Sequence, residues 1–469
     1  MNKIRLALGV ILIFLLVKCS NNDEVMGEEN GWAKLDEVLD SIKAPVFPDL
    51  EINVKDFGAV SDDANDDRKA FIDAINECNT KGGGKVIVPA GEYICNGPIV
   101  LMSNVNFYTE EGVVIKFSIN PADYLPVVHT RWEGVELFNY SSLIYAYEQS
   151  NIAVTGKGVF DGQASNENWW RWKGRQEYGW NDGMPSQDDS SSRPLLMKMN
   201  FDNVPVEKRV FGEGTYLRPN FIQPYKCKNV LIEGITFLDS PMWFIHPVLC
   251  ENVVVQGVTT KGKGPNNDGC DPESSRYVLI KDCFFDTGDD CIAIKSGRNN
   301  DGRNIGVPSE YIVVQNCEMK DGHGGVVVGS EISGDCRYVF AENCIMDSPH
   351  LERAIRLKSN SVRGGIIEHI YARNIEVGQV SEAVLRLNMD YDPKDEGPRD
   401  FPPVMRHIYL ENITSGSSKY GLYLEGLENS KITDVFIKNC DFKRVAEGNK
   451  IKNTEELRTS DFYINGEKQ

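Results

Sequence analysis

A phrase of alternating apolar and polar residues recurs through the second half of the chain. The stretch 227–237, CKNVLIEGITF, is echoed at 250–260 and 275–285, and further copies lie at 309–319, 336–346, 369–377, 407–414 and 431–442. Its apolar anchors are 23, 25, 34 and 27 residues apart: Val230, Val253, Val278, Ile312 and Val339. Short alternating runs bounded by Gly, Asn and Asp are typical of strands, and this spacing is typical of a solenoid.

We therefore predict an all-β chain folded as a single-stranded, right-handed parallel β-helix. Each coil buries its Val, Ile and Cys, and neighbouring strands lie about 4.8 Å apart. Cys and Asn at matching positions are expected to form ladders. The spacing of Ala70, Phe71, Ala74 and Ile75 predicts a short helix over 68–78 that caps the open N-terminal end. The pattern lapses over 166–218, which predicts a long functional loop.

The first 50 residues differ from the rest. Lys3 and Arg5 precede a twelve-residue apolar run, too short to span a bilayer, so 1–19 reads as a signal peptide. The sequence before Cys19 resembles a lipobox, with Lys18 in place of a small residue. We expect 20–50 to be a tether and linker and 51–469 the β-helix. Export to the periplasm, or lipid anchoring at Cys19 in the outer membrane of a Gram-negative bacterium, follows; plain secretion is the alternative.

Composition narrows the function. Lys plus Arg total 50 against 69 Asp plus Glu, a net charge of −19, so nucleic acid is not an expected partner. Eleven of the twelve Cys follow Cys19, and none has the spacing of a metal site. We expect these eleven to be mostly free, buried thiols, and we expect no metal and no cofactor.

Residues one coil apart stack in a β-helix, so polar residues at coil-length intervals predict a cluster. This chain has such a column: Asp268, Asp289, Asp290, His323, Arg356 and Lys358. Carboxylates one or two coils apart would be separated by roughly 5 to 10 Å, which overlaps the roughly 6.5 to 9.5 Å of an inverting glycosidase. Adjacent aspartates share a cleft only if Gly288 forms a turn. Taken singly, each Asp is equally typical of a turn.

The column resembles that of polygalacturonases, glycoside hydrolase family 28, whose signature is Asn-x-Asp, Gly-Asp-Asp, Gly-His-Gly and Arg-x-Lys. These motifs occur here at 266–268, 288–290, 322–324 and 356–358, with Asn267 where many members have Thr, and the resemblance runs over about 52–442. It implies a pectin-lyase-like solenoid in which Asp289 is the general acid, Asp268 and Asp290 activate the water, and His323 supports the acid.

Substrate-binding residues are predicted around this core. Arg356 and Lys358, two apart on one strand face, are expected to bind the galacturonate carboxylate, or alternatively to pair with the catalytic carboxylates. The remaining candidates are of mixed strength, His246 being as compatible with packing as with the cleft: Asn266, His246, Tyr391, Glu331 and Arg353. The tryptophans Trp169, Trp170 and Trp172 either stack on sugars or pack on the coil.

The resemblance implies inverting hydrolysis of α-galacturonosidic bonds in pectin or pectic oligosaccharides. We also expect a monomer. The insertion at 298–309 and the segment 166–218 resemble elaborations that close one end of the groove, so we predict exo attack. The alternatives are a rhamnogalacturonan hydrolase, a calcium-dependent pectate lyase and a non-catalytic glycan-binding β-helix.

Overall fold

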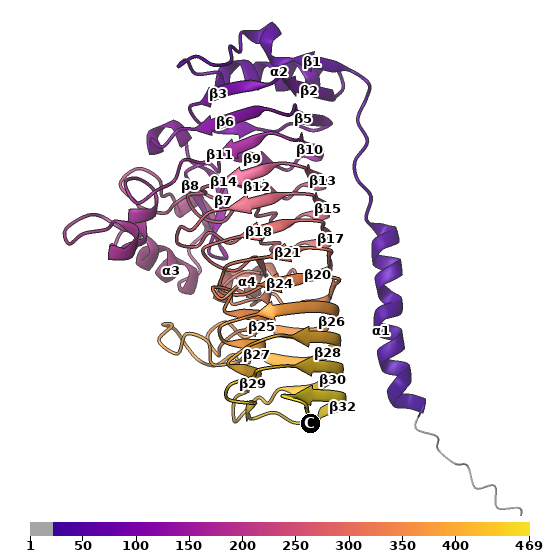
Figure 1. Cartoon of the computed structure of the whole chain (residues 1–469). Coiled ribbons are helices and arrows are strands. Elements are labelled where there is room, and N and C mark those ends of the chain that lie inside the picture. The colour runs from indigo at the N-terminus through magenta and orange to yellow at the C-terminus, as the bar shows by residue number, and fades with distance from the viewer. Residues whose placement is uncertain (1–21) are drawn as a thin grey trace, which may run out of the picture.

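The computed structural model describes residues 22–469, and these residues form the predicted right-handed parallel β-helix (Figure 1). The predicted signal peptide and Cys19 lie outside the described residues. Three ladders of parallel strands run along the coil axis. In the described part of the chain, no helix has the length and apolarity needed to cross a membrane.

The strands of the first ladder are β1 (Glu51–Asn53), β2 (Gly84–Val88), β5 (Val105–Thr109), β10 (Ser150–Gly156), β13 (Lys228–Glu233), β15 (Glu251–Gln256), β17 (Arg276–Lys281), β20 (Ser309–Gln315), β23 (Cys336–Glu342), β26 (Ile366–Gln379), β28 (Val404–Ser415), β30 (Thr433–Phe442) and β32 (Leu457–Ile464). The short β33 (Glu467–Lys468) turns back and pairs antiparallel with β32. Those of the second are β3 (Gly91–Cys95), β6 (Val113–Phe117), β11 (Val159–Asp161), β14 (Thr236–Leu238), β16 (Thr259–Lys261), β18 (Phe284–Asp286), β21 (Glu318–Met319) and β24 (Ile345–Asp347), which also pairs with β26.

The third ladder carries the groove face. Its strands are β4 (Ile99–Val100), β9 (Ile144–Tyr147), β12 (Ile222–Tyr225), β19 (Ile292–Ile294), β22 (Val326–Val328), β25 (Arg353–Lys358), β27 (Ala383–Asn388), β29 (Tyr420–Glu425) and β31 (Lys450–Lys452). Single bridges through Ile245 and Cys270 join β12 to β19, so the ladder is continuous.

The register confirms the sequence repeat. Val230 pairs with Val253, Val253 with Val278, Val278 with Ile312 and Ile312 with Val339, and all five are buried. A parallel ladder fixes this alignment, because slipping by one residue would turn every apolar side chain outward. The core is therefore one continuous column of stacked apolar side chains.

The predicted ladders of Cys and Asn are present. All eleven described cysteines are buried and free. The amides of Asn104, Asn151, Asn229 and Asn252 are linked by hydrogen bonds of 2.9, 2.8 and 2.7 Å, each at a left-handed turn with φ between 55° and 62°. Asn tolerates this backbone conformation, so the residue type serves both the turn and the ladder.

Helices decorate the coil. The predicted cap is present as α2 (Arg68–Thr80), whose Phe71 and Ile75 are fully buried. The other helices are α1 (Asn22–Ser41), α3 (Arg193–Phe201), α4 (Asn299–Ile305) and the short 3-10 helices η1 (Val54–Phe57), η2 (Pro121–Tyr124), η3 (Trp170–Lys173), η4 (Gln176–Tyr178) and η5 (Val206–Lys208).

The segment predicted as a tether and linker, 20–50, contains a helix that packs on the coil. Leu35, Val38 and Ile42 of this region are buried against an apolar stripe on the outer face of the first ladder. Trp32 lies edge-on to Tyr371 at 5.7 Å. The apolar residues at 35, 38 and 42 have the spacing of one helix face. The polar composition around them favoured a linker, so this helix was not predicted.

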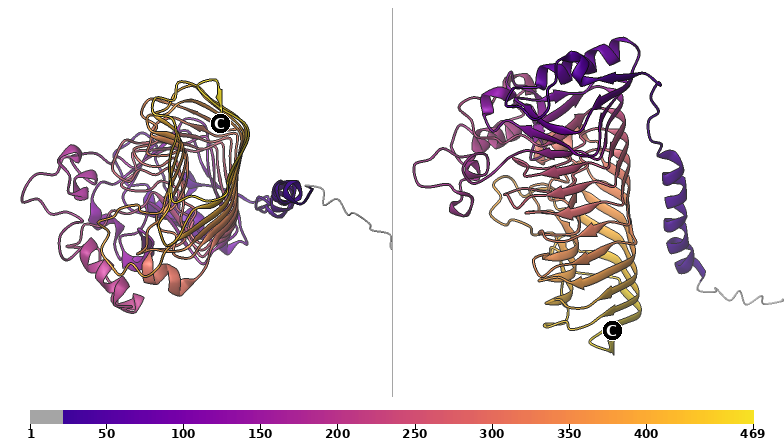
Figure 2. Two further views of the ribbon diagram at one scale, coloured as in Figure 1. Left: turned by 90° about the horizontal axis from the view of Figure 1, so that it is seen from below. Right: turned by 45° about the horizontal axis from the view of Figure 1, so that its top comes forward.

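Three inserted segments lie on the opposite side of the coil from α1 (Figure 2). They are the antiparallel hairpin of β7 (Val128–Trp132) and β8 (Val135–Asn139), the 166–218 segment with α3, and the α4 segment. Asn200 of α3 donates to the Arg298 carbonyl at 2.9 Å, and Arg209 pairs with Asp301 of α4 at 2.6 Å. The sequence lapse at 166–218 is therefore an ordered structure attached to the α4 insertion.

We expect Asn252→Ala to lower the free energy of unfolding by about 2–3 kcal/mol, since Ala loses the amide hydrogen bonds and is strained at φ 59°. Asn252→Gly keeps the backbone conformation and should cost about 1 kcal/mol less. Guanidinium unfolding of both variants measures the difference. Equal losses would show that the left-handed turn contributes nothing.

Candidate active site

The three predicted carboxylates meet on the groove side of the coil. Asp268 precedes the bridge at Cys270, and Asp289 and Asp290 precede β19 one coil later. One carboxylate oxygen from each of the three lies within 4.8 Å of the others, closer than the roughly 5 to 10 Å predicted from the coil spacing. The backbone bends at Gly288 and Asp289, so that neighbouring residues reach one site instead of opposite faces of a strand.

Glycine is required at two positions beside the cluster. A Cβ on Gly288 would lie 2.4 Å from the carbonyl oxygen of Gly264. Gly322 has φ 143°, and a Cβ there would lie 2.3 Å from the carbonyl oxygen of Asp289. The motif glycines therefore permit the coils to approach closely where the carboxylates gather.

His323 lies over Asp289, as predicted. Its Nδ1 is 2.9 Å from Asp289 Oδ1. The Asp289 charge and this hydrogen bond raise the pKa of His323 to about 9. Burial alone would raise the pKa of Asp289, but the charge of His323 and its hydrogen bond outweigh it, and the pKa of Asp289 is well below its usual range. The two side chains share one proton, which resides on the imidazole.

Arg356 and Lys358 both face Asp290. Lys358 Nζ is 2.6 Å from one Asp290 oxygen, and an Arg356 Nη1 is 3.5 Å from the other. Leu357 between them is buried in the core, as the strand alternation predicted. Of the two predicted roles, this geometry matches pairing with a catalytic carboxylate.

The sequence reasoning missed Lys295. Its Nζ lies 3.4 Å from Asp268, 3.8 Å from Asp271 and 3.6 Å from Glu331, in a fully enclosed position. Burial, with the charge of Asp271, raises the pKa of Asp268 well above its usual range. Ile292 and Ile294 are core residues of β19, so their alternation would have placed Lys295 on the cleft side.

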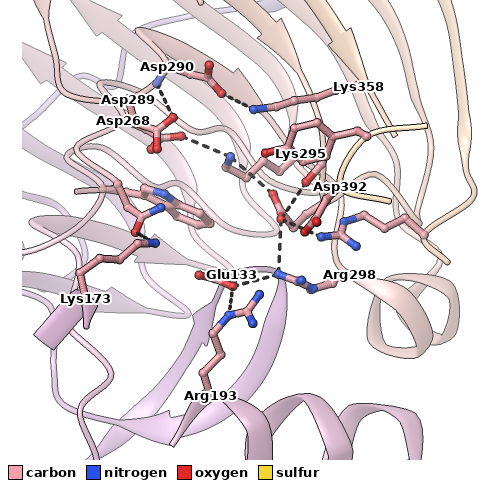
Figure 3. Close-up of a pocket in the computed structure, with 16 residues that line it drawn as sticks. Glu133, Lys173, Arg193, Asp268, Asp289, Asp290, Lys295, Arg298, Lys358 and Asp392 are labelled. Atoms are coloured by element: carbon pink, nitrogen blue, oxygen red, sulfur yellow. Dashed lines mark hydrogen bonds and ion pairs between the residues drawn. The ribbon is translucent and has the colours of Figure 1, made fainter. Parts of the chain in front are cut away.

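A cavity of about 220 Å³ opens beside the carboxylates (Figure 3). One end of it is a wall of ion pairs contributed by the inserted segments. Glu133, in the turn of the β7–β8 hairpin, pairs with Arg193 of α3 at 2.8 Å and with Arg298 at 2.9 Å. Arg298 also pairs with Asp395 at 3.3 Å.

Behind this wall lies a second cavity of about 660 Å³ between α3, α4 and the 392–397 loop. Arg193, Arg298 and Asp392 line both cavities, so they form the partition between them. The insertions at 166–218 and 298–309 therefore close one end of the groove, as the sequence predicted, and the β7–β8 hairpin, which it did not predict, supplies a central residue.

The remaining predicted substrate-binding residues fall into two groups, those that line the cavity and those that do not. Asn266, Tyr391 and Glu331 line the cavity. Arg353 pairs with Glu352 and Glu382 instead, although it also donates to the His323 carbonyl oxygen. Tyr391 lies beside the two motif cations, its ring 5.2 Å from Lys358 Nζ.

His246 does not line the cleft. It is fully buried, with Nε2 2.7 Å from Glu273 and Nδ1 accepting from Asn220 and Gln223. The β7–β8 hairpin covers this network, since Arg131 pairs with Glu273 at 3.2 Å.

The tryptophans pack on the coil and are not open platforms. Trp169 is 1% exposed and Trp172 9%, with ring centroids 4.9 Å apart. Trp170 donates to the Ser240 carbonyl oxygen at 2.9 Å.

Known proteins share this architecture. Residues 209–460 match the model of glycosyl hydrolases family 28, and 51–117 match that of rhamnogalacturonase A/epimerase, pectate lyase-like proteins. An exopolygalacturonase from Thermotoga maritima is 45% identical, with a TM-score of 0.89 over 93% of this chain and 96% of that one. A probable polygalacturonase of Vitis vinifera is 27% identical over 84% of this chain and 75% of its own length. An exo-poly-alpha-D-galacturonosidase of Dickeya chrysanthemi is 26% identical over 77% and 62%.

A parallel β-helix that gathers three carboxylates in a groove, with these relatives, defines a glycoside hydrolase. The family model covers more than half of the chain, and the Thermotoga enzyme matches nearly all of it. The chain belongs to glycoside hydrolase family 28.

We expect the His323–Asp289 pair to stabilise the fold below about pH 9. The pKa of His323 is raised above its unfolded value of 6.5, so its contribution is complete below pH 6.5 and is lost as pH rises through about 9. The melting temperature of the wild type should exceed that of His323→Gln at pH 6, and the gap should narrow between pH 7 and 9. A gap that stays constant to pH 10 contradicts the raised pKa.

Proposed function

We propose that this enzyme hydrolyses α-galacturonosidic bonds of pectin or pectic oligosaccharides and releases galacturonate from a chain end. The observation that carries the proposal is the cluster of Asp268, Asp289 and Asp290 under His323, at the blind end of a groove. The 45% identity to an exopolygalacturonase over almost the whole chain supports it.

Asp289 is proposed as the general acid. Of the three carboxylates it is the one with appreciable exposure, its side chain being 19% exposed against 4% for Asp268 and 1% for Asp290. In the unliganded site the shared proton resides on His323. A bound sugar would exclude water from the pair, and desolvation favours the neutral pair over the ion pair. The proton then passes to Asp289, which donates it to the leaving oxygen.

Asp268 and Asp290 are left to activate a water molecule. Each is held by an ammonium group, Asp268 by Lys295 and Asp290 by Lys358. Direct attack of this water on the anomeric carbon inverts its configuration. We propose this inverting outcome from the resemblance of the carboxylate column to that of polygalacturonases.

The wall of Glu133, Arg193 and Arg298 supports exo action. A polymer passing through the cavity would have to displace three linked ion pairs, each partly or fully buried. A cavity of about 220 Å³ that ends at such a wall accommodates a chain terminus. A calcium-dependent lyase is disfavoured, because Lys295, Lys358 and His323 already neutralise the carboxylates that would have to bind the ion.

We expect Asp289→Asn to lower kcat on polygalacturonate by about 10²- to 10⁴-fold, because the neutral amide is not acidic enough to protonate the leaving oxygen. A galacturonide whose leaving group needs no protonation, such as a galacturonosyl fluoride, should restore most of the rate. Asp268→Asn and Asp290→Asn should be equally impaired on both substrates.

Asp286→Asn is the matched control, since Asp286 is a surface residue paired with Lys263, and its activity should equal that of the wild type. If the fluoride restores Asp268→Asn and not Asp289→Asn, the acid and base roles are reversed.

We expect wild-type enzyme to release only monomeric galacturonate from polygalacturonate at early times. Arg298→Ala removes the residue that joins Glu133 to Asp395, and should open the partition so that oligomers appear. Product chromatography measures both. Arg175→Ala, in the 166–218 insertion but exposed and paired with Asp188, should leave the monomer as the sole product. Oligomers from the wild type would contradict exo action.

A further inference from the structure

The cations of the cavity are not equivalent. Six lysine and arginine side chains line it: Lys173, Arg193, Lys295, Arg298, Lys358 and Arg363. Five of these have a carboxylate oxygen within 4.0 Å. Lys173 has none among residues 31–469, and its Nζ donates to Asn266 Oδ1 at 2.8 Å. Among the described residues, Lys173 is therefore the cavity cation with no carboxylate at ion-pair distance, although Glu133 and Asp289 act on it from farther away.

A second cation without a carboxylate partner lies behind Lys173. Arg218 is fully buried, and all its hydrogen bonds are to neutral acceptors, including Asn266 Oδ1 at 2.9 Å and the Pro265 carbonyl oxygen at 2.7 Å. Burial lowers the pKa of Arg218 to about 10 and also lowers that of Lys173. The Lys173 and Arg218 cations thus both donate to the Asn266 amide oxygen. Two buried like charges at one neutral acceptor destabilise the empty site, and a bound anion would relieve this cost.

The tryptophan-rich turn holds Lys173 in this position. Lys173 is the last residue of η3, and the left-handed Gly174, at φ 76°, ends the turn. Trp172, one residue earlier, packs edge-on against Tyr216 at 5.2 Å, while Trp170 is tied to Ser240. The tryptophans predicted as sugar platforms therefore hold the charged side chain of Lys173 at the cavity wall. Figure 3 shows Lys173 pointing toward the cavity.

We propose that Lys173 is a specificity-determining residue that binds the carboxylate of the galacturonate unit in the cavity. One of its three ammonium hydrogens is taken by Asn266, which leaves two for an anion. Arg218 reinforces the positive field from behind. Arg356 and Lys358, predicted for this role, face Asp290 instead. This inference rests on the proposed function, since it names the part of the substrate that the same site recognises.

The test compares a galacturonide with its methyl ester on wild type, Lys173→Met and Lys173→Arg. Losing a charge-assisted hydrogen bond should lower kcat/KM of Lys173→Met for the acid by about 10- to 100-fold. The ester should change by less than about threefold, so the wild-type preference for the acid collapses. Lys173→Arg keeps the charge and should retain most of the preference. Lys157→Met, on an exposed lysine paired with Glu111, is the control and should behave as wild type.

Equal losses of Lys173→Met on acid and ester, at an unchanged melting temperature, would overturn the inference and leave the proposed function intact. Hydrolysis of neither substrate by the wild type would instead refute the proposed function. Calorimetric titration with free galacturonate then still tests Lys173, because binding needs no turnover. Equal affinity of wild type and Lys173→Met would reject the carboxylate site, and weaker binding by the variant alone would support it.

Discussion

The parallel backbone ladder is the constraint on which the rest of this structure depends. Hydrogen bonds between successive coils fix which residue lies above which, as the unbroken pairing from Val230 to Val339 shows. Side chains far apart in sequence therefore become neighbours along the groove. Asp268, Asp289 and His323 come from consecutive coils, and Lys358 reaches them from the next one. A site built in this way is as rigid as the coil that carries it.

Electrostatics complements this rigidity. The chain has a net charge of −19, yet six cations line the cavity. Most of them neutralise particular carboxylates: Lys295 lies beside Asp268, and Lys358 beside Asp290. Three carboxylates within 4.8 Å repel one another, and without these pairs they would resist ionisation still more than the raised pKa of Asp268 already indicates. The site can therefore hold several acids close together inside an acidic protein and still accept an anionic sugar.

Periodicity explains what the sequence predicted and what it did not. The coil anchors and the column of Asp268, Asp289 and His323 were predictable because they follow the coil repeat, and the cap helix because its apolar residues follow helical spacing. The sequence showed the insertions that form the wall but not the contacts between them. Pairs such as Glu133 with Arg298 join segments that are not related by the coil repeat. His246 was misplaced for the same reason, as a hairpin from an earlier coil covers it. Lys173 lies where the repeat lapses, and only the folded chain shows that it has no carboxylate partner among the described residues.

The position of helix α1 determines when it can pack on the coil during protein synthesis. Leu35 and Val38 of α1, with Ile42 directly after it, pack in one cluster with Val313, Phe340 and Tyr371, which belong to coils made much later. This early-translated helix is therefore among the last elements to dock, and its apolar face stays uncovered until most of the coil has formed. Domains of this length are exposed to aggregation while such surfaces are uncovered. A chain shortened to begin at β1 would fold with the outer stripe of its first ladder permanently bare, a surface prone to self-association.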